Sequence, residues 1–188
     1  KKKSRINYFK MKAKLLLHTC CGPCVIYVIE QLSRDFEVTV YYFNPNIHPR
    51  KEFLARKNEI QKYLDKNNIE FIEGEYDTAN WFDKTKGLEH EPEKGKRCDV
   101  CFGIRLRGTI QKAKELGYDA WATSLSISPH KNYQKISDIG KQLEEEYGID
   151  FVDRDWKKQE GYKIACSMSR EEGFYRQNYC GCIHSRRD

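Results

Sequence analysis

Short apolar runs alternate with amphipathic stretches along most of this chain. The apolar runs have the length and residue types of buried strands, and they occur at 13–20, 36–46, 69–76, 119–128 and 149–155. Between them, apolar residues recur every three or four positions, which predicts helices at 25–36, 49–68, 98–117 and 133–148. Five strands separated by helices predict an α/β fold: an open, doubly wound, mostly parallel five-stranded sheet in a three-layer, Rossmann-like arrangement.

The segment after the last predicted strand differs from the rest of the chain. Residues 155–182, "DWKKQEGYKIACSMSREEGFYRQNYCGC", mix aromatic and basic residues with three cysteines, at a point where the sheet should already be complete. A chain of 188 residues is long enough for one α/β domain with a core. We therefore expect a single domain over 1–188, with a basic tail at 1–12 and a lid-like segment at 155–188 over the site.

The positive charge of the chain is concentrated at its start. The formal net charge is +6, but seven of the 34 Lys and Arg residues lie in the first fourteen positions, which leaves 27 against 28 Asp and Glu residues elsewhere. Such a tail either contacts phosphates or is simply solvated. No run approaches the ~20 apolar residues of a membrane span, and the N-terminus lacks the apolar stretch of a secretory signal. We expect a cytoplasmic protein without a membrane partner.

The eight cysteines are the strongest chemical signal. In a cytoplasmic chain they indicate metal binding or redox catalysis rather than a disulfide framework. Cys20, Cys21 and Cys24 follow the first predicted strand, where α/β folds place their ligands. Cys98 and Cys101 form a second C-x-x-C unit. The lone Cys166 is typical of a small core residue, and we leave it out of the site.

Two C-x-x-C units suit metal coordination, because each brings two thiolates to one centre. Compact zinc knuckles separate such pairs by ~15–20 residues. Here 73 residues, with complete β/α units, lie between Cys24 and Cys98. A small local zinc fold is therefore excluded, and a site assembled by the whole fold favours an iron–sulfur cluster. A structural zinc site remains an alternative.

A thioredoxin-like thiol-disulfide oxidoreductase is a second alternative. The Cys21-Gly22-Pro23-Cys24 stretch lies between a predicted strand and helix, where the helix N-terminus lowers a thiol pKa. That fold, however, needs neither a second C-x-x-C unit nor a C-x-C unit. Cys180 and Cys182 flank Gly181, whose flexibility lets the two thiols approach, so a labile dithiol is expected there.

Several longer motifs, taken in order, resemble the QueH family of non-cobalamin epoxyqueuosine reductases. They are "HTCCGPC" at 18–24, "YDTANWF" at 76–82, "GKRCDVCFGIRL" at 95–106, "TSLSISPHKN" at 123–132 and "SREEGFYRQNYCGC" at 169–182. The resemblance runs from about residue 14 to residue 182, and the ordered set is more specific than any single motif.

The resemblance implies reduction of epoxyqueuosine to queuosine at the wobble position of tRNAs with GUN anticodons, and the sequence does not identify the electron donor. It also implies a [4Fe-4S] cluster, an additional iron ion beside it, and a fold of the nucleotide α-hydrolase (HUP) type. ATP-using proteins of that fold carry a glycine-rich pyrophosphate loop. Here "HTCCGPC" occupies that place, which argues against ATP dependence.

We assign site residues on this basis. Cys21, Cys98 and Cys101 are expected to be core cluster ligands, with Cys20 and Cys24 shared between the cluster and the additional iron. Asp99 either supplies an oxygen ligand or is solvated. His18 either donates a proton or is merely hydrogen-bonded at the end of its strand.

The remaining assignments concern electrons and RNA. The reaction consumes two electrons whereas a cluster passes one at a time, so Cys180 and Cys182 are candidates for supplying the difference. Aromatic and basic side chains suited to stacking bases and contacting phosphates are the RNA-binding candidates. These are Arg105, Arg107, Trp156, Tyr162, Phe174, Tyr175, Arg176 and Tyr179.

Overall fold

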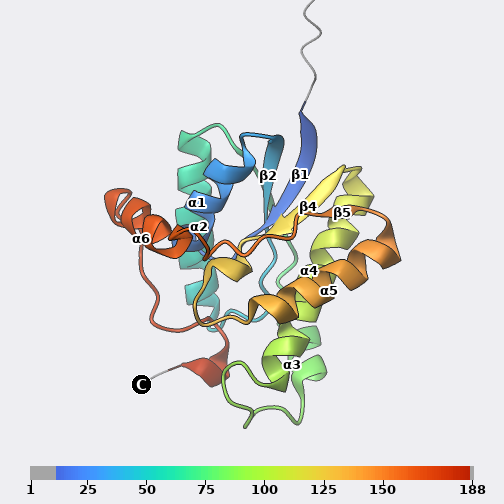
Figure 1. The fold of residues 1–188 in the computed structure, drawn as a ribbon. Helices are drawn as coiled ribbons and strands as arrows, with labels where there is room; N and C mark the ends of the chain where they lie inside the picture. Colours follow the sequence, from blue (N-terminus) through green and yellow to red (C-terminus); the bar gives the residue numbers. More distant parts are fainter. Residues whose placement is uncertain (1–11, 187–188) are drawn as a thin grey trace, which may run out of the picture.

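A parallel five-stranded sheet forms the centre of the protein (Figure 1), which we describe over residues 12–186 of a computed structural model. Its strands are β1 (Ala13–His18), β2 (Phe36–Tyr42), β3 (Glu70–Glu73), β4 (Ala120–Thr123) and β5 (Asp150–Phe151). Their order across the sheet is β3-β2-β1-β4-β5, and every neighbouring pair is parallel. The predicted α/β fold with a five-stranded parallel sheet is confirmed.

Helices cover both faces of the sheet and make three layers. They are α1 (Gly22–Leu32), α2 (Arg50–Lys66), α3 (Thr78–Thr85), α4 (Lys96–Leu116), α5 (Tyr133–Tyr147) and α6 (Gly161–Glu171), with 3-10 turns η1 (Leu125–Ile127) and η2 (Ile183–Ser185). One apolar core joins the sheet to α1, α2 and α6, and a second joins it to α4 and α5. Helix α3 packs against α4 at the end of the molecule where the cysteines lie.

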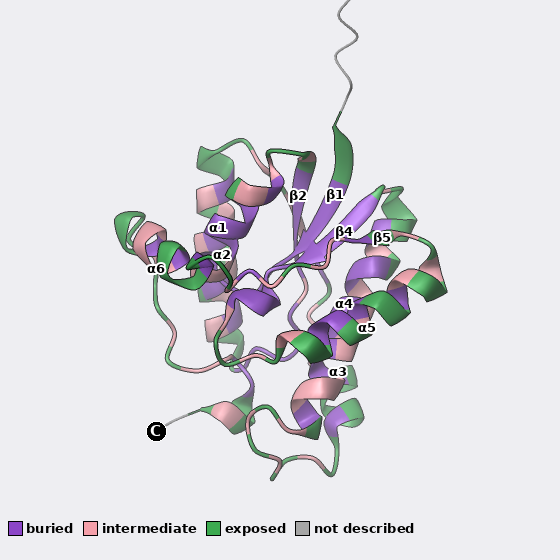
Figure 2. Ribbon diagram, in the orientation of Figure 1, coloured by how far each residue is buried: buried purple, intermediate pink, exposed green. Residues whose placement is uncertain are grey.

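The alternation of side chains along β1 explains the two cores. Leu15 and Leu17 point into the core under α1 and α2, whereas Leu16 points to the opposite face, under α4. All three are fully buried, because successive residues of a strand face opposite sides of the sheet and both sides are covered by helices. In Figure 2 the buried residues, in purple, accordingly extend along most of β1, β2 and β4, whereas the start of β1 is exposed and green.

The position of the site follows from the direction in which the sheet is built. The chain moves outwards from β1 to β2 and β3 on one side, and then continues on the other side of β1 with β4 and β5. The carboxyl ends of β1 and β4 are level, since His18 pairs with Thr123. In open α/β sheets, ligands bind where the two halves diverge in this way. The loops at 19–21 and 124–132 both begin at this point.

Two helices were not predicted from the pattern. Helix α3 lies in the motif "YDTANWF", and α6 lies in the segment that we expected to be lid-like. The run at 119–128 is also not one strand, because the chain turns into η1 after Thr123. The predicted basic tail at 1–12 falls outside the described residues except for Lys12. No helix in the part of the chain described here is long and apolar enough to cross a membrane.

Candidate thiol and metal site

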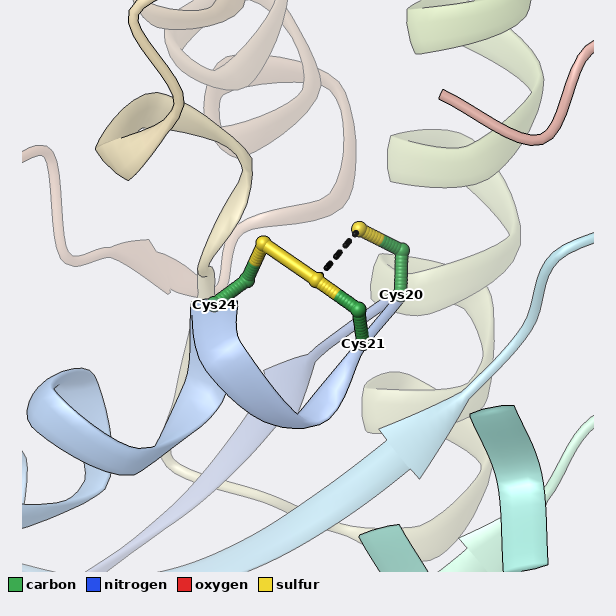
Figure 3. A group of neighbouring side chains, drawn as sticks. All are labelled: Cys20, Cys21 and Cys24. Atoms are coloured by element: carbon green, nitrogen blue, oxygen red, sulfur yellow. Dashed lines mark hydrogen bonds between the residues drawn. A yellow bond between two sulfur atoms is a disulfide. The ribbon is translucent and has the colours of Figure 1, made fainter. Parts of the chain in front are cut away.

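The first group of thiols follows β1 directly. The Sγ atoms of Cys20, Cys21 and Cys24 all lie within 4.8 Å of one another, and Figure 3 shows them on one side of the turn that leads into α1. Cys21 and Cys24 form a disulfide with their Cα atoms 5.4 Å apart, and Cys20 is a free thiol 4.0 Å from the sulfur of Cys21. Cys21 is the N-cap of α1, so the positive end of the helix faces these sulfurs.

The second group combines the first turns of α4 with the C-terminal segment. Cys98, Cys101, Cys180 and Cys182 all line one small cavity of about 30 Å³. Cys101 and Cys182 are buried against Trp81 of α3, and Cys98 Sγ accepts a hydrogen bond of 3.3 Å from the backbone N–H of Lys94. Residues separated by more than eighty positions therefore meet at one end of α4. Among the described residues, these four cysteines are free thiols.

A larger cavity of about 190 Å³ adjoins the small one and is also lined by Cys20 and Cys24. The two cavities share part of their walls, namely Glu93, His130, Lys131 and Cys180. The larger one extends under α6 and the chain after it, where it is lined by Tyr162, Cys166, Arg176 and Tyr179. Cys180 therefore lies between a chamber with four thiols and a more open chamber that holds the first thiol group.

Nearby cations lower the pKa of one thiol in this region. Burial raises the pKa of Cys20, but the positive charges of Lys131, Arg105 and Arg56 outweigh this effect, and the pKa is lowered overall. Burial also raises the pKa of Cys98 and Cys101. At these two thiols, fewer positive charges offset the effect of burial, so the pKa stays raised. Cys20 is therefore the member of these three that most favours the thiolate.

The interaction between Cys180 and Cys182 shifts the pKa values of the two thiols in opposite directions. A hydrogen bond from Cys182 lowers the pKa of Cys180, and the same interaction raises the pKa of Cys182. The hydroxyl of Ser185 lies 3.0 Å from Cys180 Sγ and adds to this stabilisation. The arrangement favours a thiolate on Cys180 and a thiol on Cys182, which is the form of a reactive dithiol.

The C-terminal segment is held firmly over these thiols. Arg56, whose side chain is only 1% exposed, donates hydrogen bonds of 3.1 Å to the carbonyls of Tyr179 and Cys180 and forms an ion pair with Glu52. The backbone N–H of His48 donates to the carbonyl of Gly181 at 2.8 Å. We call residues 179–182 the thiol strap.

Gly181 is required for the shape of the thiol strap. Its φ of 108° lies in the region that side chains disfavour, and a Cβ at this position would lie 2.8 Å from Ile47 Cγ1. The strap therefore passes close to the loop after β2, and a larger residue would push it away from Ile47.

The structure does not bring two of the predicted residues to the thiols. The Asp99 carboxylate points to α5, where it forms an ion pair with Lys135 at 3.4 Å, and it lines neither of the two cavities. His18 is fully buried, with Nδ1 2.9 Å from the Thr123 hydroxyl and Nε2 3.2 Å from the Phe43 carbonyl. Burial and the charge of Arg105 hold its pKa well below the usual value, so His18 is a neutral ring that joins β1 to its neighbours.

Three of the RNA-binding candidates do not present a free side chain to an RNA bound near the site. Arg105 is buried among the thiols rather than exposed to phosphates. Trp156 is 4% exposed and donates from Nε1 to the Thr123 carbonyl, so it is a core residue. Arg107 is exposed but pairs with Glu146 of α5 at 2.6 Å. Arg105 and Trp156 are both enclosed by protein, so neither side chain is exposed for contact with RNA in this structure.

The other candidates surround the larger cavity or lie beside it. Tyr162, Arg176 and Tyr179 line that cavity. Tyr162 is 40% exposed, and Tyr175 is 46% exposed beside the hydrogen bond that its backbone N–H donates to Glu59. Phe174 packs edge-on against Tyr63 of α2 and supports the start of this segment.

We did not predict from the sequence that two arginines at the site are buried. Arg56 occupies the core-facing stripe of α2 with Phe53, Ile60 and Leu64, and Arg105 occupies the corresponding stripe of α4 beside Leu106. A charged residue in an apolar stripe is a signal that the sequence does contain, since a buried charge needs a specific partner. The third missed residue is Lys131, which carried no comparable signal.

Comparisons with known proteins identify a family for this chain. A family model described as Epoxyqueuosine reductase QueH matches residues 15–188. Epoxyqueuosine reductase QueH of Acinetobacter baylyi is 44% identical over 177 residues, covering 93% of this chain and 81% of that protein. Epoxyqueuosine reductase QueH of Streptococcus pyogenes is 40% identical over 181 residues, covering 93% and 71%.

A solved structure shares the fold. The U34-tRNA thiolase NcsA from Methanococcus maripaludis, determined with its [4Fe-4S] cluster, superposes with a TM-score of 0.63 at 15% identity. The superposition covers 95% of this chain but only 63% of the thiolase chain. At this identity the likeness shows the fold alone.

The anchoring of the thiol strap leads to a testable expectation. Arg56→Met should leave the strap without two charge-assisted hydrogen bonds, each of which contributes about 1.5–3 kcal/mol. Cys180 and Cys182 should then be alkylated by iodoacetamide at least about tenfold faster in metal-free, reduced protein, as read by peptide mass spectrometry. The neighbouring Lys57→Met, which removes a charge that pairs with Glu73, is the control and should leave the rate unchanged. Equal rates in wild type and Arg56→Met would show that the strap does not depend on Arg56.

Proposed function

The chain belongs to the QueH family of epoxyqueuosine reductases, and on this premise we propose that it acts on tRNA with a GUN anticodon, at the wobble nucleotide. The match of the family model over residues 15–188 carries the family assignment, and the joined cavities support a site for a base that has left the anticodon stack. In the reaction the epoxide loses its oxygen as water and leaves a carbon–carbon double bond, with two electrons and two protons consumed. The electron donor is a further partner.

We propose a [4Fe-4S] cluster bound where the two thiol groups face each other. The donor set fits, since thiolates are the ligands of such clusters, and seven cysteines line the two cavities while Cys21 adjoins Cys20 and Cys24. Buried polar atoms without a partner in the described residues support a further occupant: Asn46 Oδ1, Trp81 Nε1 and Arg105 Nε belong to side chains that line the small cavity. Cys21, Cys98 and Cys101 are the ligands that we favour, with Cys20 as the fourth.

An additional iron ion beside the cluster is the second part of this proposal. Cys24 and Cys20 both line the larger cavity, and both are placed to bind it on the substrate side. The Cys21–Cys24 disulfide must be reduced before either sulfur becomes a metal ligand, which takes two electrons and yields two thiols. Asp99 is left out, because its carboxylate is engaged with Lys135.

The side chains of the larger cavity supply the remaining chemistry. When bound, the cluster supplies electrons one at a time. Lys131 lines both cavities, and its ammonium group stabilises negative charge on the epoxide oxygen as the C–O bond breaks. Tyr162 and Arg176 lie at the more exposed side, where an aromatic ring stacks on a base and a guanidinium contacts a phosphate.

Cys180 and Cys182 are proposed as a redox dithiol rather than as cluster ligands. Oxidation of the pair to a disulfide releases two electrons and two protons, which balances one turnover. The positive φ of Gly181 turns the backbone between the two cysteines, and Cys180 faces the larger cavity while Cys182 is buried behind it. The structure holds both as free thiols, whereas Cys21 and Cys24 form a disulfide.

Metal content provides the first check of this proposal. Protein prepared without oxygen should be brown and contain about four or more irons with matching sulfide per chain. Cys98→Ser and Cys101→Ser should each lose most of the cluster absorbance, whereas Cys166→Ser should retain it and serves as the control. Colourless protein with one zinc per chain would contradict the cofactor assignment.

Restoration of queuosine provides the check on substrate. In a host that accumulates epoxyqueuosine, the chain should restore queuosine in tRNA, measured by mass spectrometry of nucleosides. With purified protein, activity should fall steeply between low and high salt, because phosphate contacts release counterions. Persistent epoxyqueuosine in the presence of an intact cluster would defeat the assignment.

The dithiol proposal separates two populations of cysteines. Cys180→Ser and Cys182→Ser should retain nearly all iron and the cluster spectrum but lose turnover by at least about a hundredfold, since neither variant can form the disulfide that releases the two electrons. If iron content and spectrum change together with activity, both residues are cluster ligands. Normal turnover in both variants would make the pair bystanders.

A further inference from the structure

Arg105 is a buried cation at the centre of the thiol site. It lies on α4, one turn after Cys101, and only 2% of the residue is exposed. One guanidinium nitrogen donates to Asn44 Oδ1 at 2.8 Å, whereas Nε has no partner in the described residues. The group also lines the small cavity with four thiols. It is therefore a fixed charge with unused hydrogen-bonding capacity directed at the site.

Three cysteines lie around this cation. Cys101 and Cys180 line the same small cavity as Arg105, and Cys20 also interacts with its guanidinium group. These three cysteines come from the loop after β1, from α4 and from the thiol strap. Arg105 is thus the point at which three separate segments of the site meet one charge.

A buried guanidinium cannot relieve its charge by losing its proton, because its intrinsic pKa is far above neutrality. It must be compensated by nearby anions, or the cost of desolvation destabilises the fold. A carboxylate is the usual partner of a buried Arg. Here four cysteines line the small cavity beside Arg105, so its charge is placed to act on an anionic group that these cysteines bind.

We propose that Arg105 is a positioning residue that raises the reduction potential of the thiolate-bound cluster. The inference rests on the proposed function, since it requires a cluster held by these thiols. Such a cluster gains one negative charge when it is reduced, and a fixed positive charge favours the more negative form. Burial strengthens the effect, because little water screens it. Hydrogen bonds to cluster sulfurs act in the same direction.

Arg105 also has a structural role, from which the electrostatic one must be distinguished. Asn44, its hydrogen-bond partner, donates through Nδ2 to the carbonyl of Thr19 at 2.8 Å, next to Cys20. The chain Arg105, Asn44, Thr19 therefore links α4 to the loops after β2 and β1. Loss of the Arg105 side chain breaks this link. A purely structural effect of this kind changes how much cluster is assembled, not the reduction potential of the cluster.

The test is a reductive titration of the cluster under anaerobic conditions, followed by electron paramagnetic resonance and visible absorbance. Arg105→Gln keeps a hydrogen-bonding side chain but removes the charge. The equilibrium constant for reduction should fall at least about tenfold, which corresponds to ~59 mV for one electron. Arg105→Lys keeps the charge and should remain within about threefold of the wild type, since the ammonium occupies nearly the same place.

Two further variants control for structure. Arg107→Gln makes the same change of charge two residues later on the same helix, but the side chain is exposed and paired with Glu146. Its effect should stay below about twofold, because water and salt screen exposed charges. Asn44→Asp is nearly isosteric and places a negative charge against the intact guanidinium, while it also removes the Nδ2 donor to the Thr19 carbonyl and so breaks the same link as loss of Arg105. It should lower the equilibrium constant in the same direction as Arg105→Gln.

The outcomes separate this inference from the proposed function. If wild-type protein holds no cluster, the cofactor assignment itself is wrong. If wild type, Arg105→Gln and Asn44→Asp all hold the cluster and have equal reduction potentials, only the inference about Arg105 is wrong. If iron is lost from Arg105→Gln, Arg105→Lys and Asn44→Asp alike, Arg105 acts in assembly and the electrostatic role is overturned.

Discussion

The level register of β1 and β4 determines where everything else in the site lies. His18 pairs with Thr123, so the chain leaves both strands at the same height, on the side of the sheet where its two halves diverge. The loop after β1 carries the first thiols, and the loop after β4 carries Lys131. Since β1 is the central strand and is buried on both faces, this register cannot slip without moving Leu15, Leu16 and Leu17 out of their cores.

The sequence was sufficient for the sheet because its strands are continuous apolar runs with clear helical patterns between them. It was insufficient for α3 and α6, whose apolar positions pack against α4 and α1. Both helices are amphipathic, but they are only 8 and 11 residues long. They also lie outside the alternation of strands and helices that builds the sheet, in segments that we assigned to a family motif and to a lid.

The cysteines could be predicted as a group from their spacing, but their partition could not. Cys98 and Cys101 are fixed to each other by one turn of α4, whereas their approach to Cys180 and Cys182 depends on Arg56 and on the hydrogen bond between His48 and Gly181. Asp99 shows the same limit. Its place between two cysteines in the sequence suggested a ligand, but residues adjacent on a helix point in different directions, and this carboxylate points to Lys135.

The start of α1 shows how one structural position serves different chemistry. In nucleotide-binding relatives of this fold, the helix after the first strand presents its positive N-terminus to a pyrophosphate. Here Cys21 is the N-cap and Cys24 lies in the first turn, so the same field acts on sulfur. Thiolates, and the net negative cluster that we propose they hold, are anions like a phosphate. Arg105 and Lys131 add further positive charge, which acts on Cys20. On this proposal, cysteines in the loop and nearby cations together allow a turn that is suited to phosphate to stabilise a redox centre instead.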